Sequence, residues 1–97
     1  MLFAQPYKVS QRLTDLPNIS LQTASRLTKV GIRTADDLLN GDPYQIFELM
    51  LKKIDPNLSR QDLAIIVGAY KGCHYNNVLS EAIREYRLRH PKHVWKK

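Results

Sequence analysis

The sequence Leu-Pro-Asn-Ile-Ser-Leu-Gln-Thr-Ala, residues 16–24, decides the fold of this chain. Pro17 disfavours the helical conformation for the residue before it and so ends a preceding helix. Asn18 can adopt a left-handed turn conformation, and Ser20 can cap the helix that follows. The stretch therefore predicts two short helices joined by a tight polar turn, which is the outline of a helix-hairpin-helix.

The helix that begins after Ser20 is the candidate nucleic-acid site. Its first backbone N–H groups have no partner inside the helix and the helix dipole makes this end positive, so it suits an anion such as a DNA phosphate. The candidate DNA-binding residues in this region are Asn18, Ser20, Leu21, Gln22, Thr23, Arg26, Lys29 and Arg33. The competing interpretation is a turn that only joins two packed helices, with its cations on a solvated face.

Helical periodicity, with clear start and stop signals, continues along the chain. Thr34 with Asp37 forms a capping-box pattern, and a second pattern begins at Ser59. The expected helices run from about 8 to 15, 21 to 30, 35 to 39, 43 to 54, 60 to 71 and 81 to 89, the last capped by Ser80. The side chains expected to point inward are Val9, Leu13, Leu16, Leu21, Ala24, Leu27, Val30, Ile46, Phe47, Met50, Leu51, Ile54, Leu63, Ile66, Val67 and Tyr70.

These patterns predict an all-α fold, a small bundle of five or six short helices with a helix-hairpin-helix (SAM-like) core. A chain of 97 residues, 43% of them hydrophobic, can form one small domain with a modest core. We therefore expect a single domain over residues 1–97, with a core of about 8–90 and a loosely held basic tail at 91–97.

The net charge of +6 is unevenly distributed. Residues 8–33 carry five basic side chains against one acid, and residues 83–97 carry six against one, whereas residues 34–58 carry five acids against two lysines. Such polarity suits a polyanionic partner. Arg84, Arg87 and Arg89 are therefore added to the candidate DNA-binding residues.

The sequence shows few features of an enzyme, a metal-binding protein or a membrane protein. Cys73 is the only cysteine, and His90 and His93 are separated by a helix-breaking proline, so no metal site is assigned. His74 lacks a nucleophile and an orienting group, and is interpreted as a structural helix cap. No secretion signal or membrane span is recognised, so a cytoplasmic, non-catalytic protein without a cofactor is expected.

The chain from about Leu13 to Tyr86 resembles the C-terminal domain of the TfoX/Sxy competence-regulator family. The residues that carry the resemblance are Leu16-Pro17-Asn18-Ile19-Ser20, Gly31-Ile32-Arg33-Thr34, Asp37-Leu38, Gly68-Ala69, Gly72 and His74-Tyr75. The middle of the chain is also similar to small helix-hairpin-helix proteins of the pathogenicity-locus family, which lack the His-aromatic ending. The first resemblance implies a stand-alone domain of DNA-associated competence regulation.

Two functions follow, and the sequence leaves both open. The first is a DNA-binding regulatory module that grips the sugar-phosphate backbone without reading sequence. The second is a protein-interaction module, with a regulatory partner docked around Met50 or Tyr86. DNA-binding hairpins of this class usually carry glycines where this chain has Asn18 and Ser20, which favours the second function, while the charge distribution favours the first.

Overall fold

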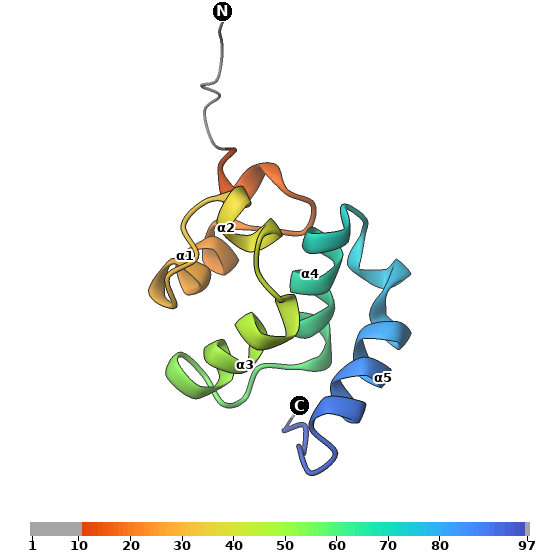
Figure 1. The fold of residues 1–97 in the computed structure, drawn as a ribbon. Coiled ribbons are helices and arrows are strands. Elements are labelled where there is room, and N and C mark those ends of the chain that lie inside the picture. Colours follow the sequence, from red (N-terminus) through yellow and green to blue (C-terminus); the bar gives the residue numbers. More distant parts are fainter. Residues whose placement is uncertain (1–10, 97) are drawn as a thin grey trace, which may run out of the picture.

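The structure is a computed structural model that describes residues 11–96. Within these residues the chain is all-helical, with five α-helices and two short 3-10 helices (Figure 1). In chain order the elements are η2 (Leu13–Asp15), α1 (Leu21–Lys29), α2 (Ala35–Leu39), α3 (Pro43–Lys53), α4 (Arg60–Lys71), η3 (Tyr75–Asn77) and α5 (Leu79–Arg89). The predicted all-α fold is confirmed.

Local capping interactions set most helix boundaries, as the sequence predicts. The Thr34 and Ser59 side chains each accept a hydrogen bond from the amide three residues later, and each belongs to a complete capping box. Asp42 caps α3, with Pro43 as its first residue. Gly72 ends α4 in the left-handed conformation, with φ of 78°. These groups lie close together in sequence, so their pairing needs no tertiary structure.

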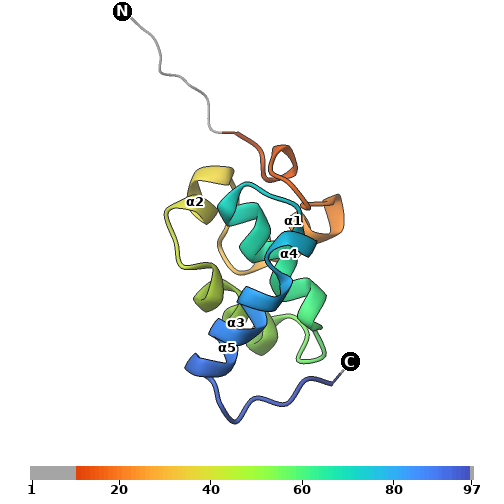
Figure 2. The same ribbon diagram turned by 90° about the vertical axis from the view of Figure 1, so that its right-hand side faces the viewer.

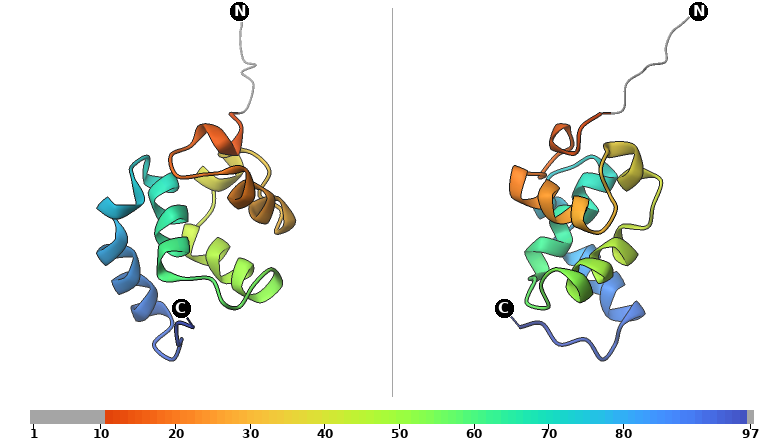
Figure 3. Two further views of the ribbon diagram at one scale, coloured as in Figure 1. Left: turned by 180° about the vertical axis from the view of Figure 1, so that it is seen from behind. Right: turned by 90° about the vertical axis from the view of Figure 1, so that its left-hand side faces the viewer.

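Helix α4 is the centre of the fold. It packs against α3 on one side and against η3 and α5 on the other, and views from perpendicular directions show it inside the bundle (Figures 2 and 3). Leu63, Ile66 and Val67 of α4 are fully buried. They join Leu27, Leu38, Phe47 and Met50 in the core.

The expectation of a helix over residues 8–15 is wrong for residues 11–15, the part of this range that the structure describes. Only Leu13–Asp15 is helical, as a single 3-10 turn, and Val9 lies outside the described residues. The Gln11 carbonyl accepts a hydrogen bond from the Ala35 amide. The adjacent residue, Arg12, forms an isolated backbone bridge to Thr34. At Gln11 and Arg12, extended pairing with the start of α2 is found in place of the expected helix.

Three further expectations are corrected. Leu21, expected to point inward, is 81% exposed, because it occupies the first helical position of α1 and faces solvent. Tyr70, also expected inside, is 38% exposed. Ser80 does not cap α5, because this helix begins at Leu79, two residues earlier than expected, and its N-cap residue Val78 makes no side-chain cap.

The C-terminal tail is also held more firmly than predicted. Trp95 packs against the core cluster, and its ring lies 5.9 Å from the Phe47 ring and 5.5 Å from the Tyr86 ring. Residues 91–96 have no helix or strand, and they turn back past the end of α5 (Figure 2). The aromatic contacts, which the sequence could not show, hold this segment.

None of the helices within residues 11–96 has both the length and the apolar character needed to cross a membrane. The same residues contain no group of three His, Cys, Asp or Glu side chains arranged to bind a metal ion.

Candidate nucleic-acid interface

The turn formed by residues 16–20 is fixed by one asparagine. Asn18 has φ of 71°, the left-handed conformation that the sequence allowed. Its side-chain Nδ2 donates to the Cys73 carbonyl at 2.9 Å, and its Oδ1 accepts from the Tyr75 amide at 3.2 Å. Asn18 therefore links the first turn to the connection between α4 and η3.

Gly68 on α4 makes this link possible. A Cβ at this position would lie 2.6 Å from the Asn18 Nδ2 and 2.8 Å from the Cys73 carbonyl oxygen. Both distances are too short for a real contact, so a larger residue would push the two turns apart. The absence of a side chain at Gly68 therefore lets the Asn18 side chain and the Cys73 carbonyl approach α4 closely.

The start of α1 presents two free amides beyond this anchored turn. The Ser20 Oγ accepts from the Thr23 amide at 3.2 Å and donates to the Thr23 hydroxyl at 3.3 Å, so both groups are occupied by capping. The Leu21 and Gln22 amides form no hydrogen bond to other groups within residues 11–96. Both residues are exposed, which leaves two oriented N–H groups facing solvent.

The electrostatics of this helix start differ from those of the others. Helix α1 has no acid at its N-cap or in its first turn. The other α-helices within residues 11–96 carry an acid at one of these places, namely Asp36 and Asp37 in α2, Asp42 before α3, Asp62 in α4 and Glu81 in α5. The positive end of the α1 dipole is therefore not neutralised from within its own helix.

The candidate cations on and after α1 divide into two groups. Arg26 is half-buried and its guanidinium lies 3.9 Å from the Asp62 carboxylate at the start of α4, so it contributes to helix packing. Lys29 and Arg33 are exposed. Lys29 is at the other end of α1, about 12 Å along the axis from Leu21 at about 1.5 Å per residue. The structure therefore does not gather all the predicted phosphate contacts around one point.

The arginines of α5 lie elsewhere on the molecule. Helix α5 packs on α4 and η3, and α1 and α5 occupy opposite flanks (Figures 1 and 3). Arg84 and Arg87 are exposed, but Arg89 bonds to Asp42 at 2.7 Å and to Glu85 at 2.9 Å.

The position of Arg89 has a structural effect. Its guanidinium lies over the Tyr44 ring, 4.5 Å from the centroid. Burial opposes ionisation of Asp42, but the Arg89 hydrogen bond and the Tyr44 amide outweigh it and lower the pKa of this carboxyl group. Arg89 therefore joins the start of α3 to the end of α5.

Comparison with known proteins supplies the family. The family model of the TfoX C-terminal domain matches residues 9–90. The chain belongs to the TfoX C-terminal domain family. Membership in this family supports a regulatory, DNA-associated role in general terms.

A crystal structure of an uncharacterized protein from Listeria monocytogenes has the same fold as this TfoX C-terminal domain, with a TM-score of 0.71. The two chains are 22% identical, and the match covers 86% of this chain and 98% of the Listeria chain. No curated protein matches the sequence.

The residues suggested for protein docking are not accessible in this TfoX C-terminal domain. Met50 and Tyr86 are each 2% exposed and belong to the core. A partner could reach the helix faces around them but not these two side chains, so docking on those faces stays a prediction.

The histidine interpreted as a cap has a related role at a different helix. The His74 Nδ1 accepts a hydrogen bond from the Asn76 amide at 3.1 Å, so it caps the start of η3 rather than the end of α4. Its ring stacks on Tyr75 with centroids 4.5 Å apart. The His-aromatic pair of the family therefore shapes the segment to which Asn18 is bound.

Proposed function

We propose that this chain is a non-catalytic regulatory module that contacts the DNA sugar-phosphate backbone through the start of α1. The observation that carries the proposal is the pair of exposed Leu21 and Gln22 amides at a helix end without an acid. Backbone amides at a helix N-terminus bind phosphate oxygens by charge-assisted hydrogen bonds. The contact would be independent of base sequence.

The other candidate residues take supporting roles in this proposal. Asn18, Ser20 and Thr23 shape the turn and the helix start, because their side chains are engaged inside the protein. Lys29 and Arg33 attract the duplex from the far end of α1. Arg84 and Arg87 add positive charge on another flank, and such long-range attraction depends on ionic strength.

A protein partner is the second candidate function, and one observation favours it. Leu21 projects beside the free amides with 81% of its surface exposed. An exposed leucine at a helix end can anchor in an apolar pocket of another protein. The two functions require different parts of the same residue, the amide for DNA and the side chain for a protein.

Two substitutions of Leu21 separate these functions. Leu21→Pro removes the amide hydrogen at the first helical position, where proline is tolerated and where the preceding Ser20 already has extended backbone angles. Leu21→Ala keeps the amide and removes the side chain. Circular dichroism would check that both variants keep the helix content of the parent chain.

The measurement is the affinity for a labelled generic DNA duplex across a salt series. We expect Leu21→Pro to weaken binding about tenfold or more, since hydrogen bonds to charged groups contribute about 1.5–3 kcal/mol, and Leu21→Ala to bind almost as the parent does. Lys29→Ala with Arg33→Ala should reduce the slope of log affinity against log salt by about 0.9 for each phosphate that is no longer neutralised. Unchanged binding by Leu21→Pro, or no binding by the parent, would refute the phosphate contact.

A further inference from the structure

The C-terminal tail covers an aromatic part of the core. Residues 91–96 leave the end of α5 and run back across the region between α5 and α3. Trp95 packs against Phe47 of α3 and Tyr86 of α5. The Arg60 guanidinium at the start of α4 lies 5.5 Å from the Trp95 ring centroid. One tryptophan therefore connects the tail to three helices.

His93 is enclosed within this arrangement. Its ring meets Tyr86 edge-on, with centroids 5.2 Å apart and an interplanar angle of 85°, and meets Trp95 at 4.6 Å and 83°. Its Nε2 is buried and makes no hydrogen bond to any group within residues 11–96. Such a site accommodates a neutral imidazole, whereas an imidazolium there would be desolvated without a compensating partner.

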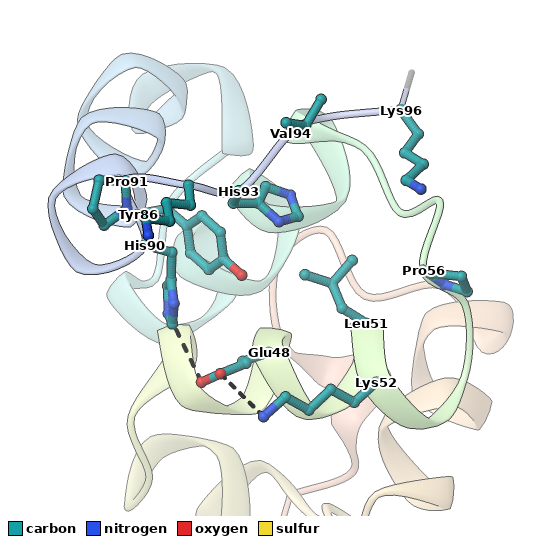
Figure 4. A pocket seen from close by; sticks show the side chains of 11 residues that line it. Glu48, Leu51, Lys52, Pro56, Tyr86, His90, Pro91, His93, Val94 and Lys96 are labelled. Atoms are coloured by element: carbon teal, nitrogen blue, oxygen red, sulfur yellow. Dashed lines mark ion pairs between the residues drawn. The ribbon is translucent and has the colours of Figure 1, made fainter.

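The charged groups around His93 do not provide that partner. A pocket of about 630 Å³ beside the ring is bordered by Glu48, Lys52, His90, Lys92 and Lys96 (Figure 4). A second pocket of about 340 Å³, also lined by His93, is bordered by Arg60, Arg87 and His90. Glu48 is the one acid among these lining residues.

Glu48 is already engaged by two other groups. Its carboxylate lies 3.3 Å from the Lys52 ammonium and 3.8 Å from the His90 imidazole (Figure 4). The remaining titratable neighbours are the Tyr86 hydroxyl, whose pKa is raised by burial and by Glu48, and cationic side chains. A proton on His93 would therefore face mostly positive charge.

We propose that residues 91–96 form a latch that protonation of His93 opens. In the closed state neutral His93 and Trp95 pack on Tyr86 and cover the groove between α3 and α5. Protonation places a desolvated cation beside His90 and Lys96, and the tail leaves the groove so that the imidazolium reaches water. Opening uncovers Tyr86 and Phe47 without requiring any helix to unfold.

The direction of the pH response follows from linkage. Burial, followed by the charges of His90 and Lys96, lowers the pKa of His93 below its ordinary value of 6.5 in the closed state. The open state binds the proton more tightly, so the closed state is favoured above pH 6.5 and loses this advantage as the pH falls through the depressed pKa. Within this window the opening constant should rise up to about tenfold for each pH unit.

His90 provides an internal contrast. Its Nε2 lies 3.8 Å from the Glu48 carboxylate, whereas the buried His93 Nε2 makes no hydrogen bond within residues 11–96. His90 is therefore the matched control for His93.

The test uses the single tryptophan of the chain as a reporter. The Trp95 emission maximum and its quenching by acrylamide are measured from pH 8 to 4.5, with far-UV circular dichroism on the same samples. We expect a red-shift and greater quenching as the pH falls, while helix content stays constant. Emission intensity is not used, because a protonated histidine next to tryptophan can quench it without opening the latch.

Variants assign the response to one histidine. His93→Gln and His93→Phe cannot titrate and should abolish the pH dependence, whereas His90→Gln should retain it. The proposal is overturned if the parent shows no change in emission maximum, if exposure of Trp95 coincides with loss of helix, or if His93→Gln and the parent respond alike. A His93→Phe variant that failed to fold would leave His93→Gln to decide.

Discussion

Helices α1 and α4 both begin at a serine N-cap, but only α4 is closed by an acid. In α4 the Asp62 carboxylate accepts hydrogen bonds from the Ser59 amide and hydroxyl at 2.8 and 3.1 Å and also pairs with Arg26. Residue 23 occupies the equivalent position in α1 and is a threonine, bonded to Ser20. The start of α4 is completed inside the protein, and the start of α1 remains available to an external anion.

The turn before α1 is also fixed in position by remote residues. Asn18 anchors this turn to residues more than 50 positions away. An anion site made of backbone amides needs a fixed orientation, because the amides cannot rotate independently of the chain. Substitutions in the Asn18 anchor should therefore affect the protein most, and substitutions at the helix starts less.

Replacing Asn18 should have the largest effect. Asn18→Ala leaves the Cys73 carbonyl and the Tyr75 amide without their partner and places alanine at a φ of 71°. We expect a loss of about 3 kcal/mol in unfolding free energy, measured by urea denaturation, since a buried group left unsatisfied costs about 1–3 kcal/mol. Asn18→Gly relieves the backbone strain but does not restore the hydrogen bonds, so it should recover only about 1 kcal/mol of that loss. Full recovery by Asn18→Gly would show that the hydrogen bonds are unimportant.

Gly68 tests the same anchor from the α4 side. Gly68→Ala should lower the unfolding free energy by about 2–3 kcal/mol, because the added methyl group overlaps Asn18 and the Cys73 carbonyl. Gly72→Ala is the matched control, since a Cβ there meets nothing within 4 Å and only the positive φ opposes it. Its cost should be about 1 kcal/mol. Equal losses in the two variants would contradict the proposed close contact.

Giving α1 an acid should make it resemble α4. Gln22→Glu places a carboxylate in the first turn and should stabilise the protein by about 0.3–1 kcal/mol through the helix dipole, while it weakens DNA binding several-fold. Gln22→Lys should instead destabilise the protein and strengthen DNA binding. Thermal unfolding and duplex binding are measured on the same preparations. If both variants left binding unchanged, the start of α1 would not be the phosphate site.

The smallest effect concerns α2, which is closed in the same way as α4. The Asp37 carboxylate accepts hydrogen bonds from the Arg33 and Thr34 amides, and these bonds, the one from Arg33 first, lower its pKa below 3.8 despite some desolvation. The stability that these hydrogen bonds contribute is present above pH 3.8, and it is lost as the pH falls through the lowered pKa of Asp37. Asp37→Asn should therefore flatten the decrease in stability between pH 5 and 2, followed by urea denaturation. A parallel decrease in parent and variant would rule out this linkage.

The sequence predicted the helix starts well because capping is local. Thr34, Asp42 and Ser59 each bond to an amide two or three residues away, and Ser20 does the same. Such contacts form whenever the helix forms. Where no side chain caps a helix, as at Leu79, the sequence offered no signal and the predicted boundary was wrong.

The roles of the candidate site residues were less predictable. Arg26 and Arg89 are basic residues of the kind that contact DNA phosphates. Arg26 instead pairs with Asp62 of α4, and Arg89 pairs with Asp42, the N-cap of α3. Trp95 lies beyond the last predicted helix and still packs on the core. No local pattern distinguishes an arginine that faces solvent from one that faces another helix.

The sequence by itself determined the helical class, the breaks at Pro17 and Gly72, and the capped start of α1, since all of these depend on neighbouring residues. Only the tertiary structure decided that the Asn18 side chain bonds to remote backbone groups, that Leu21 is exposed and that the His93 Nε2 has no hydrogen-bond partner within residues 11–96. The physical reason is distance along the chain. Hydrogen-bond satisfaction and burial at these positions depend on groups that folding brings together from remote segments.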